Sequence, residues 1–117
     1  MIPTADLRQE LRELLDEVIP AGGTESDTRF TNTQLDRLLS RTSNIYAAAA
    51  EGWTRKAAML QRELGQIEGY SVGQERYDLR KLQDMLDYAL KMAETYSRMA
   101  ASSMGSVILR IQPPEVL

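Results

Sequence analysis

Apolar residues between Asp78 and Ser103 repeat at alternating steps of three and four, which predicts one long helix with an apolar face. The row along this face consists of Leu79, Leu82, Leu86, Ala89, Ala93, Tyr96 and Ala100. A second row lies about 100° further round the helix and consists of Met85, Tyr88, Met92, Thr95 and Met99. Most charged residues of this range form a narrow stripe, made of Arg80, Asp84, Asp87, Lys91, Glu94 and Arg98. The pattern predicts a helix that is covered on two sides.

The second row has two interpretations. A methionine-rich row is most often part of a core, because thioethers fill irregular gaps, and both rows then pack inside one chain. The first row already supplies a core-facing side, however, and an apolar surplus commonly marks contact with another chain. We therefore predict a subunit interface made by Met85, Tyr88, Met92 and Met99.

Three shorter helices are predicted before the long one. The first begins after Thr4 or Asp6, since Asp6 and Gln9 have the spacing of a capping box, and Pro20 ends it. Its buried side is expected to contain Leu7, Leu11, Leu14, Leu15 and Val18. The polar run that follows, residues 24–29, indicates an exposed loop.

The second helix has a sharper start. Thr31 and Gln34 have the spacing of a capping box, while Phe30 and Leu35 are placed to form a hydrophobic staple. Its apolar side is Leu35, Leu38 and Leu39. Such a short helix must dock on its neighbours to be stable.

The third helix is predicted to begin after Ser43 or Asn44 and to end at Leu64, with Gly65 as its C-terminal stop. The alanines at 47–50 and Gly52 allow close approach of another helix, so we expect the third and fourth helices to pack antiparallel there. The expected core anchors are Trp53, Tyr46, Leu82, Leu86 and Tyr96. The predicted fold class is all-α, a small bundle of about four helices.

Two segments outside these helices have patterns of their own. Glycines punctuate the link from Gly65 to Tyr77, which predicts either a short β-like arm or a flexible loop. Residues 107–117 predict an extended tail after a helical domain of residues 1–106, because β-branched residues and a double proline favour an extended chain. Such a tail either folds onto its own core or binds another chain. The residues predicted to bind a partner are Val107, Ile108, Leu109, Arg110, Ile111, Pro113 and Pro114.

Composition narrows the function. With 117 residues the chain is expected to form one domain, and the absence of cysteine and histidine argues against disulfides, thiolate metal sites and the usual neutral-pH acid or base. No phosphate-binding loop or nucleophile–base set is apparent, so we expect no catalytic residues, no cofactor and no metal. The net charge of −3 is concentrated in the first helix, which argues against sequence-specific DNA binding. We expect a soluble protein without a signal peptide or a membrane span.

Stretches spread over most of the chain after the first helix carry a resemblance to a known family. In chain order they are the runs Phe30 to Leu35, Asn44 to Tyr46 with the alanines that follow, Glu51 to Trp53, Arg55 to Ala57, Tyr70 to Gly73, and the helix Leu79 to Tyr96. In their order and spacing these stretches resemble the small head-tail connector, or adaptor, proteins of long-tailed bacteriophages. No portal-binding motif of that family maps onto residues 107–117 residue by residue.

The resemblance implies a virion structural protein, made in the host cytoplasm, that forms a ring at the head-tail junction. Such rings are usually dodecameric, sit below the portal protein, extend the DNA channel and offer a platform to the next tail-completion, or stopper, protein. DNA passes through the lumen without sequence-specific binding. The family often uses its C-terminal tail to grip the portal or a neighbouring subunit, a role that residues 107–117 would fill here.

Three other classes of protein fit the sequence less well. A secreted helical-hairpin effector or chaperone-like binding module would usually carry Trp-x-Gly between its helices, whereas Gly52 precedes Trp53 inside a helix. A helix-turn-helix regulator would read DNA from a helix that begins near Ile45, where alanines offer few base-reading side chains. An enzyme is the weakest candidate. The small helical oligomeric binding module remains the alternative to the connector.

Overall fold

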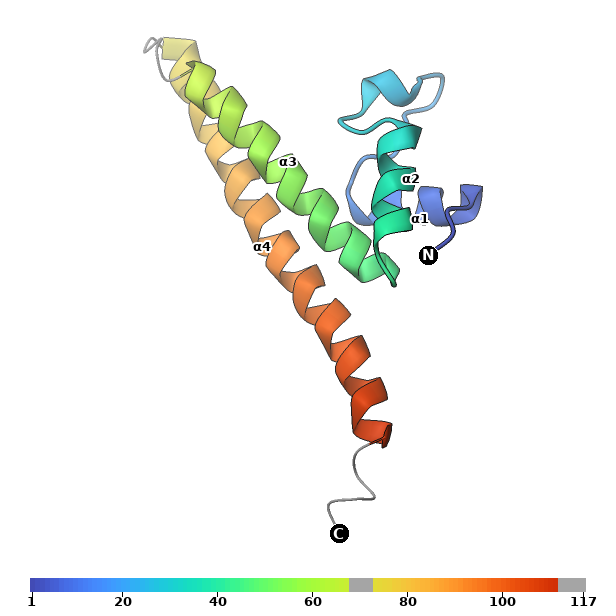
Figure 1. The fold of residues 1–117 in the computed structure, drawn as a ribbon. Coiled ribbons are helices and arrows are strands. Elements are labelled where there is room, and N and C mark those ends of the chain that lie inside the picture. Colours follow the sequence, from blue (N-terminus) through green and yellow to red (C-terminus); the bar gives the residue numbers. More distant parts are fainter. Residues whose placement is uncertain (68–72, 112–117) are drawn as a thin grey trace.

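The computed structural model describes the backbone of residues 1–67 and 73–111 and the side chains of residues 1–66 and 79–102. The elements in order are α1 (Ala5–Leu14), the short 3-10 helix η1 (Glu25–Asp27), α2 (Asn32–Arg41), α3 (Ile45–Ile67) and α4 (Gly73–Ile111). Every regular element in these described ranges is a helix, which confirms the all-α prediction (Figure 1).

The two long helices form an antiparallel hairpin, as predicted (Figure 1). Their shared core contains Trp53, Leu60 and Leu64 from α3, together with Leu86 and Ala89 from α4. Near the start of α3 the Tyr46 and Tyr96 rings stack, with 6.2 Å between their centroids. At 1.5 Å per residue, the 39 residues of α4 against the 23 of α3 make α4 longer by about 24 Å. It therefore continues past the first residue of α3 (Figure 1).

Of the two expected starts of α1, the one after Thr4 is confirmed, two residues before a start after Asp6. The Thr4 hydroxyl accepts a hydrogen bond from the Leu7 amide at 3.1 Å, so Thr4 caps the helix and the expected box of Asp6 and Gln9 is not formed. The helix ends at Leu14, and Asp16 adopts a left-handed backbone conformation with φ of 57°. The assignment of Val18 to the buried side was wrong: it lies beyond the helix and is 50% exposed.

The predicted start of α2 is confirmed. Thr31 and Gln34 form a reciprocal capping box, and Phe30 and Leu35 are both buried. The segment before it is more ordered than a polar loop, because Thr24 and Asp27 form a second capping box around η1. Two caps within eight residues hold this stretch in a defined path.

The link between the long helices is more helical than predicted. Helix α3 does not stop at Gly65 but continues to Ile67, and α4 already begins at Gly73. Those parts of the expected β-like arm are therefore helical, while residues 68–72 lie outside the described residues. A glycine inside a helix costs only about 1 kcal/mol, which packing between two long helices readily offsets.

The extended conformation expected from residue 107 onward was also wrong for residues 107–111. Helix α4 runs to Ile111, so the backbone from Val107 to Ile111 is helical rather than extended. β-branched residues lower helix propensity by only a few tenths of a kcal/mol each, and extending an existing helix needs no new nucleation. Pro113 and Pro114 lie outside the described residues, as do the side chains of residues 103–117.

Candidate functional site

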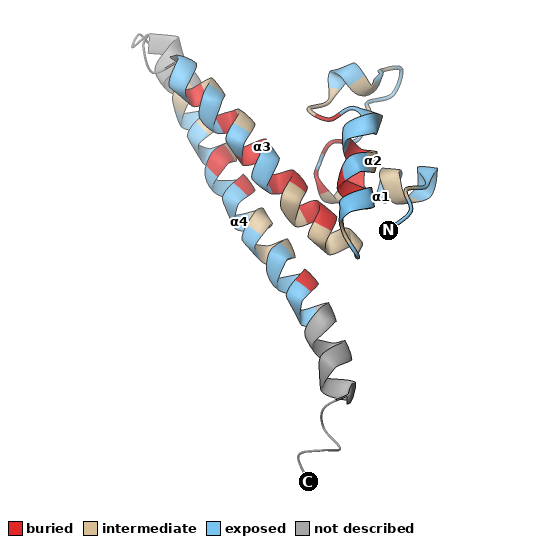
Figure 2. Cartoon of the chain, in the orientation of Figure 1, coloured by how far each residue is buried: buried red, intermediate tan, exposed pale blue. Residues whose placement is uncertain are grey.

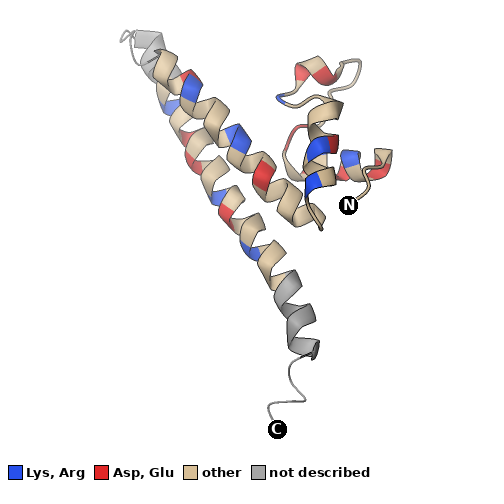
Figure 3. Cartoon of the chain, in the orientation of Figure 1, with Lys and Arg blue, Asp and Glu red and all other residues tan. Residues whose placement is uncertain are grey.

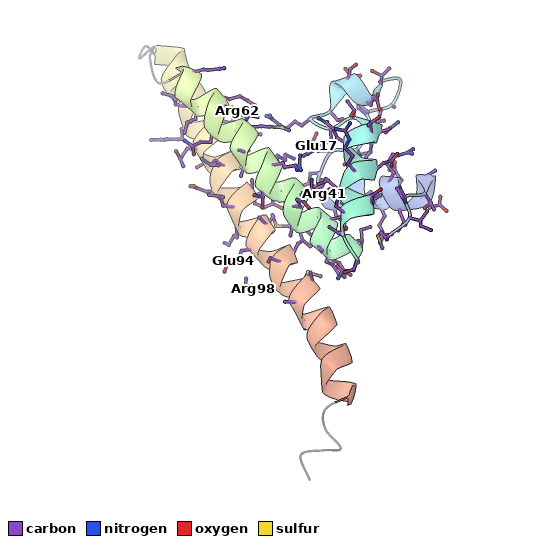
Figure 4. The ribbon with its side chains drawn as sticks, in the orientation of Figure 1. Glu17, Arg41, Arg62, Glu94 and Arg98 are labelled. Atoms are coloured by element: carbon purple, nitrogen blue, oxygen red, sulfur yellow. The ribbon has the colours of Figure 1, made fainter. Side chains whose placement is uncertain are left out.

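The second apolar row of α4 is only partly covered by its own chain. Met85 and Met92 are half-buried against the core, whereas Tyr88 is 49% and Met99 39% exposed. The charged stripe from Arg80 to Arg98 lies fully on the exposed side, where Glu94 and Arg98 are labelled (Figures 2 and 4). The predicted interface residues thus lie between the core and the solvent.

Tyr88 and Met85 border a hollow of about 230 Å³ between α4, α3 and the end of α1. Its other lining residues are Asp16, Trp53, Lys56 and Leu60. The Tyr88 ring meets the Trp53 ring edge to face, with 5.6 Å between centroids, and this contact limits how the tyrosine can move. The second apolar row of α4 therefore places the Tyr88 ring, held in one orientation by Trp53, beside a shallow and mostly apolar hollow.

A buried ion pair lies behind this hollow and joins α3 to the chain after α1. The Lys56 ammonium lies 2.6 Å from a Glu17 carboxylate oxygen and also donates to the Leu15 carbonyl at 2.9 Å. Both side chains are below 10% exposed, and Figure 4 shows Glu17 between α3 and the α1–α2 side of the molecule. The ammonium also lies 4.5 Å from the centre of the Trp53 ring. This pair was not predicted from the sequence.

The carbonyl groups at the end of α1 are capped by side chains of α3. The Trp53 indole N–H donates to the Leu14 carbonyl at 3.0 Å, one residue before the carbonyl that Lys56 binds. Helix ends leave such carbonyls without intrahelical partners. Trp53 is therefore more than the apolar anchor expected from sequence, because it also positions α1.

Gly52 brings α1 and α3 together. A Cβ at this position would lie 2.7 Å from a methyl carbon of Leu15, closer than side chains approach one another. The small residue is needed as predicted, but the segment that approaches it follows α1. The expectation that Gly52 serves the contact with α4 was wrong.

Arg12 is a second buried cation, 1% exposed. Its guanidinium donates four hydrogen bonds of 2.9–3.0 Å, to the carbonyls of Glu17 and Phe30, the Thr28 hydroxyl and the Asn32 side chain. Burial lowers the pKa of Arg12, but arginine titrates far above neutral pH and stays charged. Arg12 therefore ties α1 to the connection before α2.

The other sequence-predicted core anchors lie at or beside the core. Leu86 is buried, and Leu82 and Tyr96 are partly buried against the same core. Tyr46 is partly buried and stacks on Tyr96. The predicted partner-binding residues between Val107 and Pro114 have side chains outside the described set. The buried charged residues that were not predicted have one sequence feature in common, because each is directly next to a residue of an apolar row. These residues are Arg12, Glu17 and Lys56.

The described residues contain no cluster of three or more His, Cys, Asp or Glu side chains that could hold a metal ion. Among the described helices, none combines the length and apolar character needed to cross a bilayer. What this surface offers is apolar contact beside a rigid aromatic pair. The sequence matches no family model, no curated protein and no solved structure.

Proposed function

We propose that this chain is a head-tail connector adaptor of a long-tailed bacteriophage. In this role it forms a ring below the portal protein, extends the DNA channel and offers a platform to the tail-completion protein. The proposal rests on the resemblance of the stretches between Phe30 and Tyr96, and on a helix whose apolar surface exceeds what its own chain covers.

That surplus on α4 is the observation that carries the proposal. Tyr88, Leu90 and Met99 are each between 39% and 53% exposed, and α4 continues past the start of α3. A long helix with exposed apolar side chains favours packing against another chain. The seam of Met85, Tyr88, Met92 and Met99 is the subunit contact that we propose.

The C-terminal segment is the portal contact in this proposal. Residues 107–111 form the last turns of α4, in the part that extends beyond α3, and this end of the helix lies at a distance from the α1–α2 side of the molecule (Figure 1). Four of the five residues from Val107 to Ile111 are apolar, which suits contact with another protein chain.

Mass spectrometry of purified phage particles whose genome encodes this chain tests the proposal directly. The chain should be present at about one copy per portal subunit, and particles made with a chain that lacks residues 108–117 should lack it. Absence of the intact chain from particles would overturn the proposal. Such an absence, together with export of the chain from the host, would favour the secreted helical binding module instead.

Met99→Glu tests the α4 seam as a subunit contact. A charge on this exposed position should weaken ring formation on portal-bearing capsids while circular dichroism stays unchanged, because Met99 contributes little to the core. Glu94→Lys on the charged stripe is the matched control. Rings that form normally from the Met99→Glu chain would exclude this part of α4 from the interface.

A further inference from the structure

A groove runs between α2 and α3 on a different side of the molecule from the α4 seam. It encloses about 300 Å³ and is lined by Phe30, Gln34, Leu38, Arg55, Ala58, Met59 and Arg62. An adjoining hollow shares Met59 and Arg62 and is extended by Arg29, Glu63 and Gln66. The floor is apolar and the α3 rim is basic, which suits an apolar surface that carries acidic side chains.

The two arginines on the α3 rim are weakly neutralised. No carboxylate of the described residues lies within ion-pair distance of Arg62. Arg55 lies 3.4 Å from Glu51, but this carboxylate is also 2.9 Å from Arg41 and is shared between them. Arg55 and Arg62 are seven residues apart, which is about 10.5 Å along one side of a helix.

Helix α1 presents the opposite charge with the same spacing. Asp6, Glu10 and Glu13 are exposed, and Asp6 and Glu13 are also seven residues apart, about 10.5 Å. The two cations of α1 point inward, since Arg8 forms a two-bond ion pair with Asp36 and Arg12 is buried. The exposed side of α1 therefore carries negative charge without compensation (Figure 3).

The acidic side of α1 cannot reach the groove of its own chain. Asp36 of α2 binds Arg8 of α1, whereas Gln34 of α2 lines the groove. These two residues are two positions apart in the sequence, so their side chains point about 200° apart around α2. Helix α1 and the groove are thus on opposite sides of α2. The complementary surfaces can meet only between two copies.

We propose that the α2–α3 groove binds the acidic side of α1 from a second copy of this chain. Because the two surfaces differ, the contact is head to tail, and repeated head-to-tail contacts close into a ring or continue as a filament. The inference rests on the proposed ring-forming function and names a second surface of that ring. Ile2, which is 83% exposed just before α1, supplies an apolar side chain for the groove floor.

Reciprocal charge reversal tests the contact by sedimentation velocity of the full chain. Glu10→Lys and Arg62→Glu should each weaken self-association by about tenfold or more, because each places like charges opposite one another. An equimolar mixture of the two variants should restore it, since every contact in an alternating array then pairs opposite charges. Glu94→Lys and Arg98→Glu, at exposed positions on α4, are the matched controls and should associate as the unmodified chain does.

Several outcomes would overturn the inference. These are an unmodified chain that stays monomeric at its highest soluble concentration, single variants that associate normally, and a mixture that stays as weak as its components. Loss of particle incorporation with Arg62→Glu but not with Glu10→Lys would overturn it too, because the groove then binds another acidic protein. If the chain is present in particles but charge reversal does not change its self-association, the groove contact is wrong and the proposed function stands. If the chain self-associates as expected but is absent from particles, the proposed function is wrong and the groove contact stands.

Chemical cross-linking gives an independent readout, because the chain contains no cysteine. A variant with both Glu10→Cys and Arg62→Cys, treated with a short bismaleimide, should give a ladder of dimers and larger species. A mixture of the two single variants should stop at dimers, since each copy then has one reactive end. Absence of a ladder at concentrations where the chain self-associates would place the contact elsewhere.

Discussion

Helix α3 packs on two sides with different chemistry. Toward α4 it presents Ala57, Leu60 and Leu64, and the shared core is almost entirely apolar. Toward α1 it presents Gly52, against which the Leu15 side chain packs closely, and Lys56, which forms a buried ion pair. The same helix thus joins two neighbours by two different kinds of contact.

The two sides of α3 contribute differently to the stability of the fold and to the positions of its helices. Apolar contact is non-directional and grows with the area removed from water, so it holds the hairpin without selecting one position along it. A buried ion pair contributes little net stability but is costly to break, because it leaves a charge without a partner. We expect the side that contacts α1 to define one docking position and the side that contacts α4 to supply most of the stability.

Lys56→Met gives the largest expected loss. It leaves Glu17 buried without its cation and should lower the free energy of unfolding by about 3–5 kcal/mol, as measured by urea denaturation. The double variant Glu17→Gln with Lys56→Met should recover part of this loss, whereas Lys91→Met on the exposed stripe should change stability by less than about 0.5 kcal/mol. A loss below about 1 kcal/mol for Lys56→Met would mean that the pair does not organise this side of α3.

Leu86→Ala tests the apolar side with a somewhat smaller expected effect. It removes a buried side chain from the α3–α4 core and should cost about 2–4 kcal/mol in the same measurement. Leu90, one turn further along α4, is 53% exposed, so Leu90→Ala should cost less than about 0.5 kcal/mol. Equal losses for the two leucines would contradict the assigned inner and outer sides of α4.

A pair of glycine substitutions separates close approach from helix propensity. Gly65→Ala meets open space and should raise the free energy of unfolding by about 0.5–1 kcal/mol. Gly52→Ala gains the same propensity but forces Leu15 aside, and should be destabilising by about 1 kcal/mol net. Thermal unfolding measured for both should give shifts of opposite sign. Shifts of the same sign would mean that α1 does not approach α3 closely at Gly52.

The stacked tyrosines give the smallest expected effect, which appears only in alkaline solution. Burial raises the pKa of Tyr96 above its ordinary value, so the unfolded chain loses this proton first as the pH rises. Stability contributed by the neutral ring is present below about pH 10 and is lost as the pH rises through the folded-state pKa. Tyr96→Phe should make the urea midpoint less dependent on pH in that range. An unchanged dependence would contradict a desolvated Tyr96.

Much of the fold follows from local patterns. The cap at Thr31, the apolar side of α2 and the antiparallel long helices could be predicted, because capping chemistry and a period of 3.6 residues are encoded in adjacent positions. Helix ends were less predictable. Gly65 and Gly105 signal stops by themselves, yet long helices continue through both.

The sequence by itself determined that this chain is all-α, that α4 has an apolar surplus, and that α1 is acidic. It did not reveal that Lys56 and Arg12 are buried, nor that Gly52 faces the end of α1. Those features depend on residues up to 41 positions away that supply a carbonyl or carboxylate partner. Only the tertiary structure decides which charged residues find such partners, because a charge beside an apolar row is either solvated or paired and local sequence is the same in both cases.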